Sequence, residues 1–326
     1  MSLKPRRHPR PTRQDRNGPV PRSKPRAAAS QAETAGEVSL APGLYLVATP
    51  IGNLGDIGAR ALKVLGGADL VACEDTRTTR KLLSAYGLAP PLAAYHEHNA
   101  ARVRPGLIAR IKAGEAVALV SDAGTPLISD PGYKLVRAAA EAGLAVTTVP
   151  GPSAPLAALT ISGLPSDRFM FAGFLPAKTA ARRRDLAALK AVPATLIFFE
   201  TARRLPATLS AMAEALGARE AAVAREMTKL HEEVRRDTLE ALTAHYAAAG
   251  PPKGEVVIVV GPPEDTRAEI AEAELDARLG EALSQARSLR DAVAAVAAET
   301  GLPRQRVYAR ALALGGRRDA PGDADA

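Results

Sequence analysis

The chain has 326 residues, 47% of them hydrophobic, and its 43 Lys and Arg side chains against 35 Asp and Glu give a net charge of +8. This length suits two ordinary domains with extensions, and the one cysteine, Cys73, excludes an intramolecular disulfide and a cysteine-rich zinc site. No apolar stretch approaches the roughly 18 residues that a membrane span needs, so we expect no membrane partner and a reducing, cytoplasmic location.

The excess positive charge lies at the N-terminus. Residues 1–26 carry nine Lys and Arg against Asp15, which equals the whole net charge of +8. Because residues 1–40 are rich in proline and poor in large apolar side chains, we predict a disordered basic arm there, and a second disordered tail over 315–326. Such an arm either adds salt-sensitive contacts to RNA phosphates or serves as a solubilising tail.

Strands and helices alternate in the predicted first α/β domain, residues 41–149. Short apolar runs predict strands, and longer periodic segments predict helices. The predicted strands are 43–48, 68–72, 117–120 and 145–149, and the predicted helices are 59–65, 102–112 and 133–142. Four strand–helix alternations indicate a largely parallel sheet with helices on its faces.

Turn-forming and polar residues follow each of these strands. The four segments are 49–56, 73–80, 121–132 and 150–154. The carboxyl ends of parallel strands meet at one edge of a sheet, where open α/β sheets hold their ligands. The segments contain neither the G-x-G-x-x-G of a dinucleotide fold nor a P-loop, which argues against NAD binding and nucleoside triphosphate hydrolysis.

The segment 117–133, VALVSDAGTPLISDPGY, is the most informative of these. Gly124 lets the backbone come close to a ligand, and Pro126 stiffens the loop. Asp122 and Asp130 are hydrogen-bond acceptors with no basic residue beside them in the sequence. An ordinary tight turn with helix-capping residues is the alternative interpretation of this segment.

The segment 95–99 places two histidines beside an acid. His96 and His98 have the i, i+2 spacing of a metal-ligand pair, with Glu97 between them. No third ligand follows at a familiar spacing, so we expect no metal site and favour a polar loop that contributes to a cleft.

A second α/β domain is predicted over residues 150–263. The predicted strands are 169–174, 195–199, 221–224 and 256–260, with helices over 154–162 and 205–216. Hairpin-like neighbours among these strands favour a mixed sheet. Basic residues recur after successive strands, and they either solvate the strand ends or face a polyanion in a cleft.

The region 264–314 is rich in Ala, Glu and Leu at helical spacing. Ser288 begins one helix, the run 301–303 interrupts it, and 304–314 forms a second helix with several arginines. Two short helices around a glycine-containing turn are typical of a helix-turn-helix, and a dimerisation or capping hairpin is the alternative.

Eight segments together resemble the tetrapyrrole-methylase superfamily and, within it, the small-subunit ribosomal RNA methyltransferase I family. They are 44–57, 68–83, 95–99, 117–136, 149–154, 198–209, 223–233 and 254–262. The resemblance implies an α/β fold class: two α/β domains of the tetrapyrrole-methylase type with an interdomain cleft, plus a small C-terminal helical domain. It also implies S-adenosylmethionine as cofactor, a homodimer, and 2′-O-methylation of a cytidine in the decoding region of 16S ribosomal RNA in the small ribosomal subunit.

The resemblance also assigns cofactor contacts residue by residue. They fall on Pro50, Asp122, Ala123, Gly124, Thr125, Pro126, Ile128, Ser153, Ala154, Glu200 and Met227. The tetrapyrrole branch has glycine-proline-glycine-aspartate where this chain has 50–53, PIGN, and glycine-glycine-aspartate-proline where this chain has 123–126, AGTP. These departures weaken the alternative, a corrin or uroporphyrinoid C-methyltransferase. The residues found here resemble those of the ribosomal RNA branch at the same positions.

Ribose methylation requires a group that accepts the hydroxyl proton, and a substrate with phosphates requires cations. The candidate bases are Glu74, Asp75, His96, Glu97 and Asp122. The candidate RNA contacts are Arg77, Arg203, Arg204, Arg225 and Lys229. No metal is required for a methyl displacement of this kind.

Overall fold

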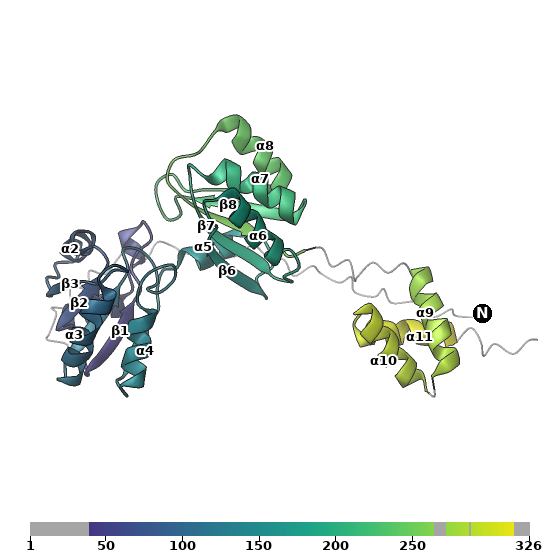
Figure 1. Cartoon of the computed structure of the whole chain (residues 1–326), viewed down its shortest axis with the longest axis horizontal. Helices are drawn as coiled ribbons and strands as arrows, with labels where there is room; N and C mark the ends of the chain where they lie inside the picture. Colours follow the sequence, from purple (N-terminus) through teal and green to yellow (C-terminus); the bar gives the residue numbers. More distant parts are fainter. Residues whose placement is uncertain (1–38, 264–271, 287, 316–326) are drawn as a thin grey trace, which may run out of the picture. The chain divides into compact units, whose positions relative to one another are not determined.

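The computed structural model describes residues 39–263, 272–286 and 288–315 (Figure 1). The predicted arm up to residue 38 and the predicted tail from 316 lie outside the described residues. The domain boundaries at 41–149, 150–263 and 264–314 stay predictions. In the part of the chain that the structure describes, no helix is long and apolar enough to cross a membrane.

The first sheet contains five strands, all paired in parallel. Their spatial order is β3-β2-β4-β1-β5. The strands are β1 (Gly43–Val47), β2 (Leu70–Cys73), β3 (Leu92–Ala94), β4 (Ala116–Val120) and β5 (Val146–Val149). The parallel sheet that the sequence predicted is confirmed, and the structure adds β3, whose three residues are too few to show a period.

Helices cover both faces of this sheet, which explains why its central strand is uniformly apolar. They are α1 (Ala59–Gly67), α2 (Thr76–Ala85), α3 (Ala100–Lys112) and α4 (Tyr133–Glu141), and a short exposed helix, η1 (Leu54–Asp56), precedes α1. Along β4, Ala118 and Val120 pack in a core with residues of α1 and α2. Val117 and Leu119 pack in a second core with residues of α3 and α4. Alternate residues of β4 thus face two apolar layers, and every residue of the strand is buried.

The second sheet is mixed, as the sequence predicted. Its order is β6-β7-β10-β8-β9, with β6 parallel to β7 and the other pairs antiparallel. The strands are β6 (Phe169–Phe174), β7 (Thr195–Thr201), β8 (Glu220–Arg225), β9 (Glu233–Thr238) and β10 (Glu255–Val260). The sequence did not predict β9, because its residues EVRRDT are charged and polar, which suits an edge strand.

Helices also cover both faces of the second sheet. They are α5 (Ala154–Ser162), α6 (Thr179–Leu189), α7 (Leu205–Leu216) and α8 (Leu239–Ala249). Ala158 and Leu159 of α5 pack with alternate residues of β7, β8 and β10. On the other face, a larger core joins α6, α7 and α8 to the same strands, with Phe198 and Met212 fully buried. The sheet is therefore fixed from both sides, and its strand ends are held in place for a site.

The three C-terminal helices share one small core. They are α9 (Glu272–Gln285), α10 (Leu289–Thr300) and α11 (Arg304–Gly315). The Ser288 hydroxyl accepts a hydrogen bond from the Asp291 amide at 3.1 Å and so caps α10. Gly301 ends α10 with a φ of +70°, a left-handed conformation that favours glycine. The predicted helix pair is therefore confirmed, with α9 packed beside it.

Candidate functional site

The loops that follow β1, β4 and β5 are tied to one another by hydrogen bonds. The Thr49 amide donates to the Gly124 carbonyl at 2.9 Å, and the Gly124 amide donates back to the Thr49 carbonyl at 3.0 Å. The Thr125 hydroxyl donates to the Pro152 carbonyl at 2.9 Å. Gly124 has a φ of +80°, so a side chain there would be strained. These contacts hold the backbone of 121–126 in one defined position.

A pocket of about 380 Å³ lies at these loops and at strand ends of the second sheet. Its volume is in the range of roughly 300–1,000 Å³ that is typical of small-molecule sites. Among the predicted cofactor residues, the pocket lining includes Ala123, Gly124, Thr125, Ile128, Ser153, Ala154, Glu200 and Met227. It does not include Pro50, Asp122 or Pro126.

The structure adds lining residues that the sequence did not assign to the site. They are Ile51, Ser129, Asp130, Pro155, Phe174, Phe199, Thr201, Ala202, Gly254, Glu255, Val256 and Val257. Most of them lie in β6, β7 or β10 or next to one of these strands, and that position was the available signal. The pocket therefore combines apolar walls with a few carboxylates, hydroxyls and backbone groups.

Glu200 lies in this lining with its side chain fully buried. Its carboxylate accepts hydrogen bonds from the Thr201 amide at 2.7 Å and the Thr208 hydroxyl at 2.6 Å. The Arg204 Nε lies 3.3 Å from the same carboxylate, and the Arg204 guanidinium also donates to the Leu175 carbonyl at 2.6 Å. Both residues are thus occupied in holding the wall of the pocket.

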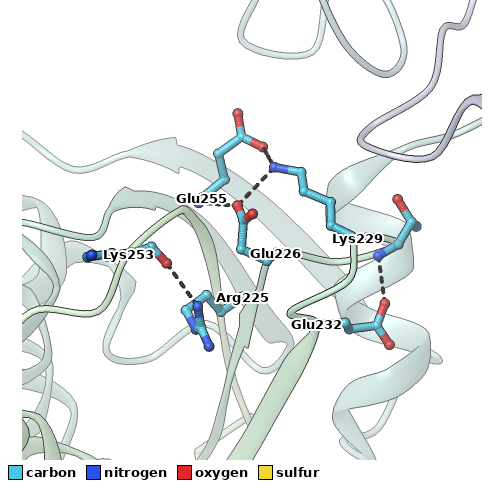
Figure 2. Close-up of polar contacts among 7 residues, drawn as sticks. Arg225, Glu226, Lys229, Glu232, Lys253 and Glu255 are labelled. Atoms are coloured by element: carbon cyan, nitrogen blue, oxygen red, sulfur yellow. Dashed lines mark hydrogen bonds and ion pairs between the residues drawn. The ribbon is translucent and has the colours of Figure 1, made fainter.

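The loop after β8 is fixed by an ion-paired cluster, drawn in Figure 2. The Lys229 ammonium lies 2.8 Å from Glu226 and 2.9 Å from Glu255, and the Glu226 carboxylate also accepts from the Glu255 amide at 2.9 Å. The hydrogen bond from Lys229 is the main cause that lowers the pKa of Glu226 below its ordinary value. Met227 of the pocket lining directly follows Glu226 in the chain, so the ion pairs fix the backbone on which Met227 lies.

Close packing around the cluster leaves no room for side chains at two glycines. A Cβ at Gly52 would lie 2.6 Å from the Lys229 Cγ, and a Cβ at Gly254 would overlap the Glu226 carboxylate. Glu226 itself has a φ of +50° and Thr228 a φ of +65°. The loop after β8 is therefore packed against the loop after β1 in a strained conformation.

The expected RNA contacts differ in how the protein already uses them. Arg225 donates to the Lys253 carbonyl at 3.1 Å (Figure 2). It also lies 2.8 Å from Glu233. Arg204 and Lys229 are ion-paired as described above, whereas Arg203 is exposed. Their roles toward RNA stay predictions.

A second, shallower hollow gathers four of the five candidate bases and Arg77. It is lined by Glu74, Asp75, Thr76, Arg77, Ala94, His96, His98 and Asp122. The fifth candidate, Glu97, does not line it. Among the described residues, no three His, Cys, Asp or Glu side chains form a group that could hold a metal ion.

Two of these candidates are engaged in hydrogen bonds. Asp75 pairs with Arg77 at 2.7 Å, and the hydrogen bond from the Arg77 side chain lowers the pKa of Asp75 to about 2. Asp122 accepts from the Asp75 amide at 3.1 Å, which connects the loops after β4 and β2. The Nδ1 atom of His96 is buried and has no hydrogen-bond partner in the described part of the chain.

Asp130 belongs to the pocket, and two carboxylates of the hollow act on its charge. It lines the pocket, and the negative charges that act on it are those of Glu74 and Asp122 in the hollow. Burial raises the pKa of Asp130 to about 6, a hydrogen bond from Ser121 lowers it, and the two neighbouring carboxylates raise it further. The sequence indicated Asp130 only as a hydrogen-bond acceptor.

Comparison with known proteins places this geometry in a family. Residues 43–243 match the family described as Tetrapyrrole (Corrin/Porphyrin) Methylases, and residues 269–315 match the RsmI C-terminal HTH domain. Diphthine synthase is similar in fold, with a TM-score of 0.54 and 19% identity over 67% of this chain and 89% of that chain.

Two curated relatives have the same name. Ribosomal RNA small subunit methyltransferase I of Mesorhizobium japonicum is 56% identical over 287 residues, which cover 88% of this chain and 96% of that protein. The protein of that name from Erythrobacter litoralis is 56% identical over 275 residues, which cover 84% of this chain and 96% of that protein. The chain therefore belongs to the ribosomal RNA small subunit methyltransferase I family within the tetrapyrrole methylases.

Proposed function

We propose that this protein transfers a methyl group from S-adenosylmethionine to the 2′-oxygen of a cytidine ribose in 16S ribosomal RNA of the small subunit. The observation that carries the proposal is the pocket at the strand ends, because eight of the eleven residues that the family resemblance assigns to the cofactor line it. The names of the curated relatives support the same substrate class.

The pocket residues fit the cofactor in size and in chemistry. The volume of about 380 Å³ suits a nucleoside with an amino-acid tail. Gly124 lines the pocket without a side chain, so its backbone groups can contact the ligand directly. We assign the backbone groups of Ala123, Gly124 and Ala154 and the hydroxyls of Thr125 and Ser153 to hold the ligand.

When bound, S-adenosylmethionine supplies an electrophilic methyl carbon on a positively charged sulfur. The protein's contribution is to hold this carbon in line with the attacking oxygen and to exclude water. Ile51, Phe199, Met227 and Val257 give the pocket its apolar wall. These side chains would exclude water from a sulfonium group held beside them.

The RNA approaches, in this proposal, across the exposed arginines near the pocket. Arg77 and Arg203 are the two members of the predicted set that are strongly exposed. The match of 269–315 to a helix-turn-helix domain favours RNA over a soluble pigment as substrate.

We also propose a homodimer in the cytoplasm. β6 is an edge strand of the second sheet, and its Phe169 and Met170 side chains are 46% and 41% exposed. Large apolar side chains on an edge strand favour coverage by a second chain. Sedimentation equilibrium of the purified protein tests this state, and a monomer at micromolar concentration contradicts it.

The proposed activity is tested by incubating the protein with tritiated S-adenosylmethionine and one of two acceptors. Small subunits from cells that lack this methyltransferase are expected to take up label in the 2′-O-methylcytidine fraction of their RNA. Uroporphyrinogen III is expected to take up none. Label in the pigment and none in the RNA would instead establish the C-methyltransferase alternative.

A further inference from the structure

We propose that Asp130 is the catalytic residue that accepts the proton of the attacking 2′-hydroxyl, an inference that rests on the proposed function. Asp130 lies in the lining of the cofactor pocket beside Ser129. Its charged neighbours, Glu74 and Asp122, line the second hollow. An acceptor group at that junction can face both a ligand in the pocket and a ribose that enters from the hollow.

The other carboxylates of the pocket are already engaged. Glu200 is buried and accepts hydrogen bonds from Thr201 and Thr208. Glu255 lies 2.9 Å from the Lys229 ammonium. Among the described acids that line the pocket, Asp130 is the one for which no ion pair with a cation is found.

The five candidates from the sequence meet this requirement less well. Asp75 is held by Arg77 and is a very weak base, because the pKa of its carboxyl is lowered to about 2. Glu97 does not line the hollow, and one carboxylate oxygen of Asp122 accepts from the Asp75 amide. Glu74 and His96 lie in the hollow and are the competing candidates in the experiment below.

The backbone fixes the position of Asp130. Leu127 and Ser129 have φ values of +75° and +66°, which non-glycine residues rarely adopt. Gly132 has a φ of +143°, and a Cβ there would lie 2.8 Å from the Leu119 side chain and 3.0 Å from that of Leu127. Strained backbone of this kind is found where a functional group must be held in one place.

The surroundings of Asp130 suit it to act as a base near neutral pH. Burial is the main cause that raises the pKa of its carboxyl to about 6. The groups that face it are the Ser121 hydroxyl and the Asp122 carboxylate after β4, and the Glu74 carboxylate after β2. Asp130 is therefore mostly ionised at pH 7 and is a stronger base than an ordinary carboxylate.

The step is balanced without any further reactant. The 2′-oxygen forms a bond to the methyl carbon as the carbon–sulfur bond breaks, and the electron pair of that bond stays on sulfur. The hydroxyl proton passes to a carboxylate oxygen of Asp130, which then releases it to water.

The test compares Asp130→Asn with Asp167→Asn, an exposed aspartate outside both pockets. Single-turnover methyl transfer to small subunits is measured from pH 5 to 8.5. The wild-type rate is expected to rise with pH and level off above about pH 6, the pKa of Asp130. Asp130→Asn is expected to lose about 100-fold or more of the rate at pH 7.5, together with this rise, and Asp167→Asn to match the wild type.

Two further measurements separate a chemical role from a structural one. Calorimetry with S-adenosylhomocysteine is expected to give Asp130→Asn a Kd within about threefold of the wild type, because an amide of the same shape fills the same space. Ser121→Ala removes a hydrogen bond that favours the ionised carboxylate, so it is expected to move the midpoint of the pH–rate profile upward.

The outcomes distinguish this inference from the proposed function. If the wild type methylates the subunits and Asp130→Asn keeps its rate and pH profile, Asp130 is not the base and Glu74→Gln and His96→Gln are the variants that should lose the rise. If the wild type methylates no subunit, the proposed function fails. In that case ¹³C NMR of the labelled Asp130 carboxyl still tests the site, because a pKa at the ordinary aspartate value overturns the inference.

Discussion

The Arg204 Nε lies 3.3 Å from a carboxylate oxygen of Glu200, whose side chain is completely buried in the pocket wall. The next residue along the chain toward the N-terminus, Arg203, is exposed. Two adjacent arginines after β7 thus have different environments. From the sequence, both are candidate RNA contacts that could instead only solvate the strand end, and the structure places them in different environments.

We expect Arg204→Ala to lower the free energy of unfolding by about 2–3 kcal/mol, because it leaves the Glu200 carboxylate buried without its cation. Arg203→Ala is the matched control and is expected to stay within about 0.5 kcal/mol of the wild type. Urea unfolding followed by circular dichroism measures both values. Equal losses in the two variants would show that the ion pair does not stabilise the fold.

Binding to small subunits compares the exposed Arg203 with the ion-paired Lys229. We expect Arg203→Gln to reduce the slope of log K against log salt concentration by about 1, because one phosphate contact is lost. Lys229→Gln is expected to leave the slope unchanged, since Lys229 is already paired with Glu226 and Glu255. Filter binding over a range of KCl concentrations measures the slopes. A reduced slope for Lys229→Gln would show that Lys229 contacts RNA phosphates despite its ion pairs.

The ion-paired cluster after β8 is tested at Gly254, which has a φ of +95°. Gly254→Ala is expected to displace the Glu226 carboxylate, disturb Met227 and weaken S-adenosylhomocysteine binding by about tenfold. Gly250→Ala has a similar backbone strain, with a φ of +77°, but open space around the new methyl group. We expect Gly250→Ala to cost stability alone. Calorimetry measures the affinities, and equal Kd values for the two variants would contradict a role for the cluster in the pocket.

Variants of Asp75 distinguish its role as the cap of α2 from a role as the catalytic base. Its carboxylate accepts from the Arg77 amide at 2.8 Å and so caps α2. We expect Asp75→Asn to keep both the cap and the methyl-transfer rate, and Asp75→Ala to lower the Tm because the cap is lost. Thermal unfolding and single-turnover rates measure the two effects. Loss of the rate in Asp75→Asn with an unchanged Tm would identify Asp75 as the base.

The raised pKa of Asp130 predicts how stability changes with pH. The folded protein holds this proton up to about pH 6, whereas the unfolded chain releases it near 3.8, the ordinary pKa of an aspartate carboxyl. The contribution of Asp130 to stability is therefore present at low pH and is lost as pH rises through about 6. At pH 7.5 we expect Asp130→Asn to be more stable than the wild type by about 1–2 kcal/mol, a value reduced for partial exposure.

This difference should vanish near pH 4, where the wild-type carboxyl is protonated in the folded protein. Guanidinium unfolding at the two pH values measures it. A constant difference between Asp130→Asn and the wild type at both pH values would mean that the carboxyl is not destabilised by burial. An inactive variant that is more stable than the wild type is what the base role predicts.

Local sequence patterns predicted the parts of the fold that depend on neighbouring residues. The buried run of β4 and the cap and glycine that bound α10 are encoded within a few residues. β3 and β9 were missed because their strand pairing comes from contacts distant in sequence. Their own residues are too few or too polar to show a strand period.

The sequence predicted which loops form the candidate site, but not how each side chain in them is paired. The segment 121–132 was recognised from its small and turn-forming residues. Two features depend on side chains that the fold brings together. They are the different environments of Arg203 and Arg204, and the effect of the Glu74 charge on the pKa of Asp130. A sequence pattern records which residues follow a strand, but not which of them are paired.

The most direct measurement maps 2′-O-methylation in small-subunit RNA from cells with the gene, without it, and with the gene restored. Our account predicts that one cytidine in the decoding region carries the ribose methyl group only when the protein is present. The Asp130→Asn protein should fail to restore it. Identical methylation maps with and without the protein would contradict the account.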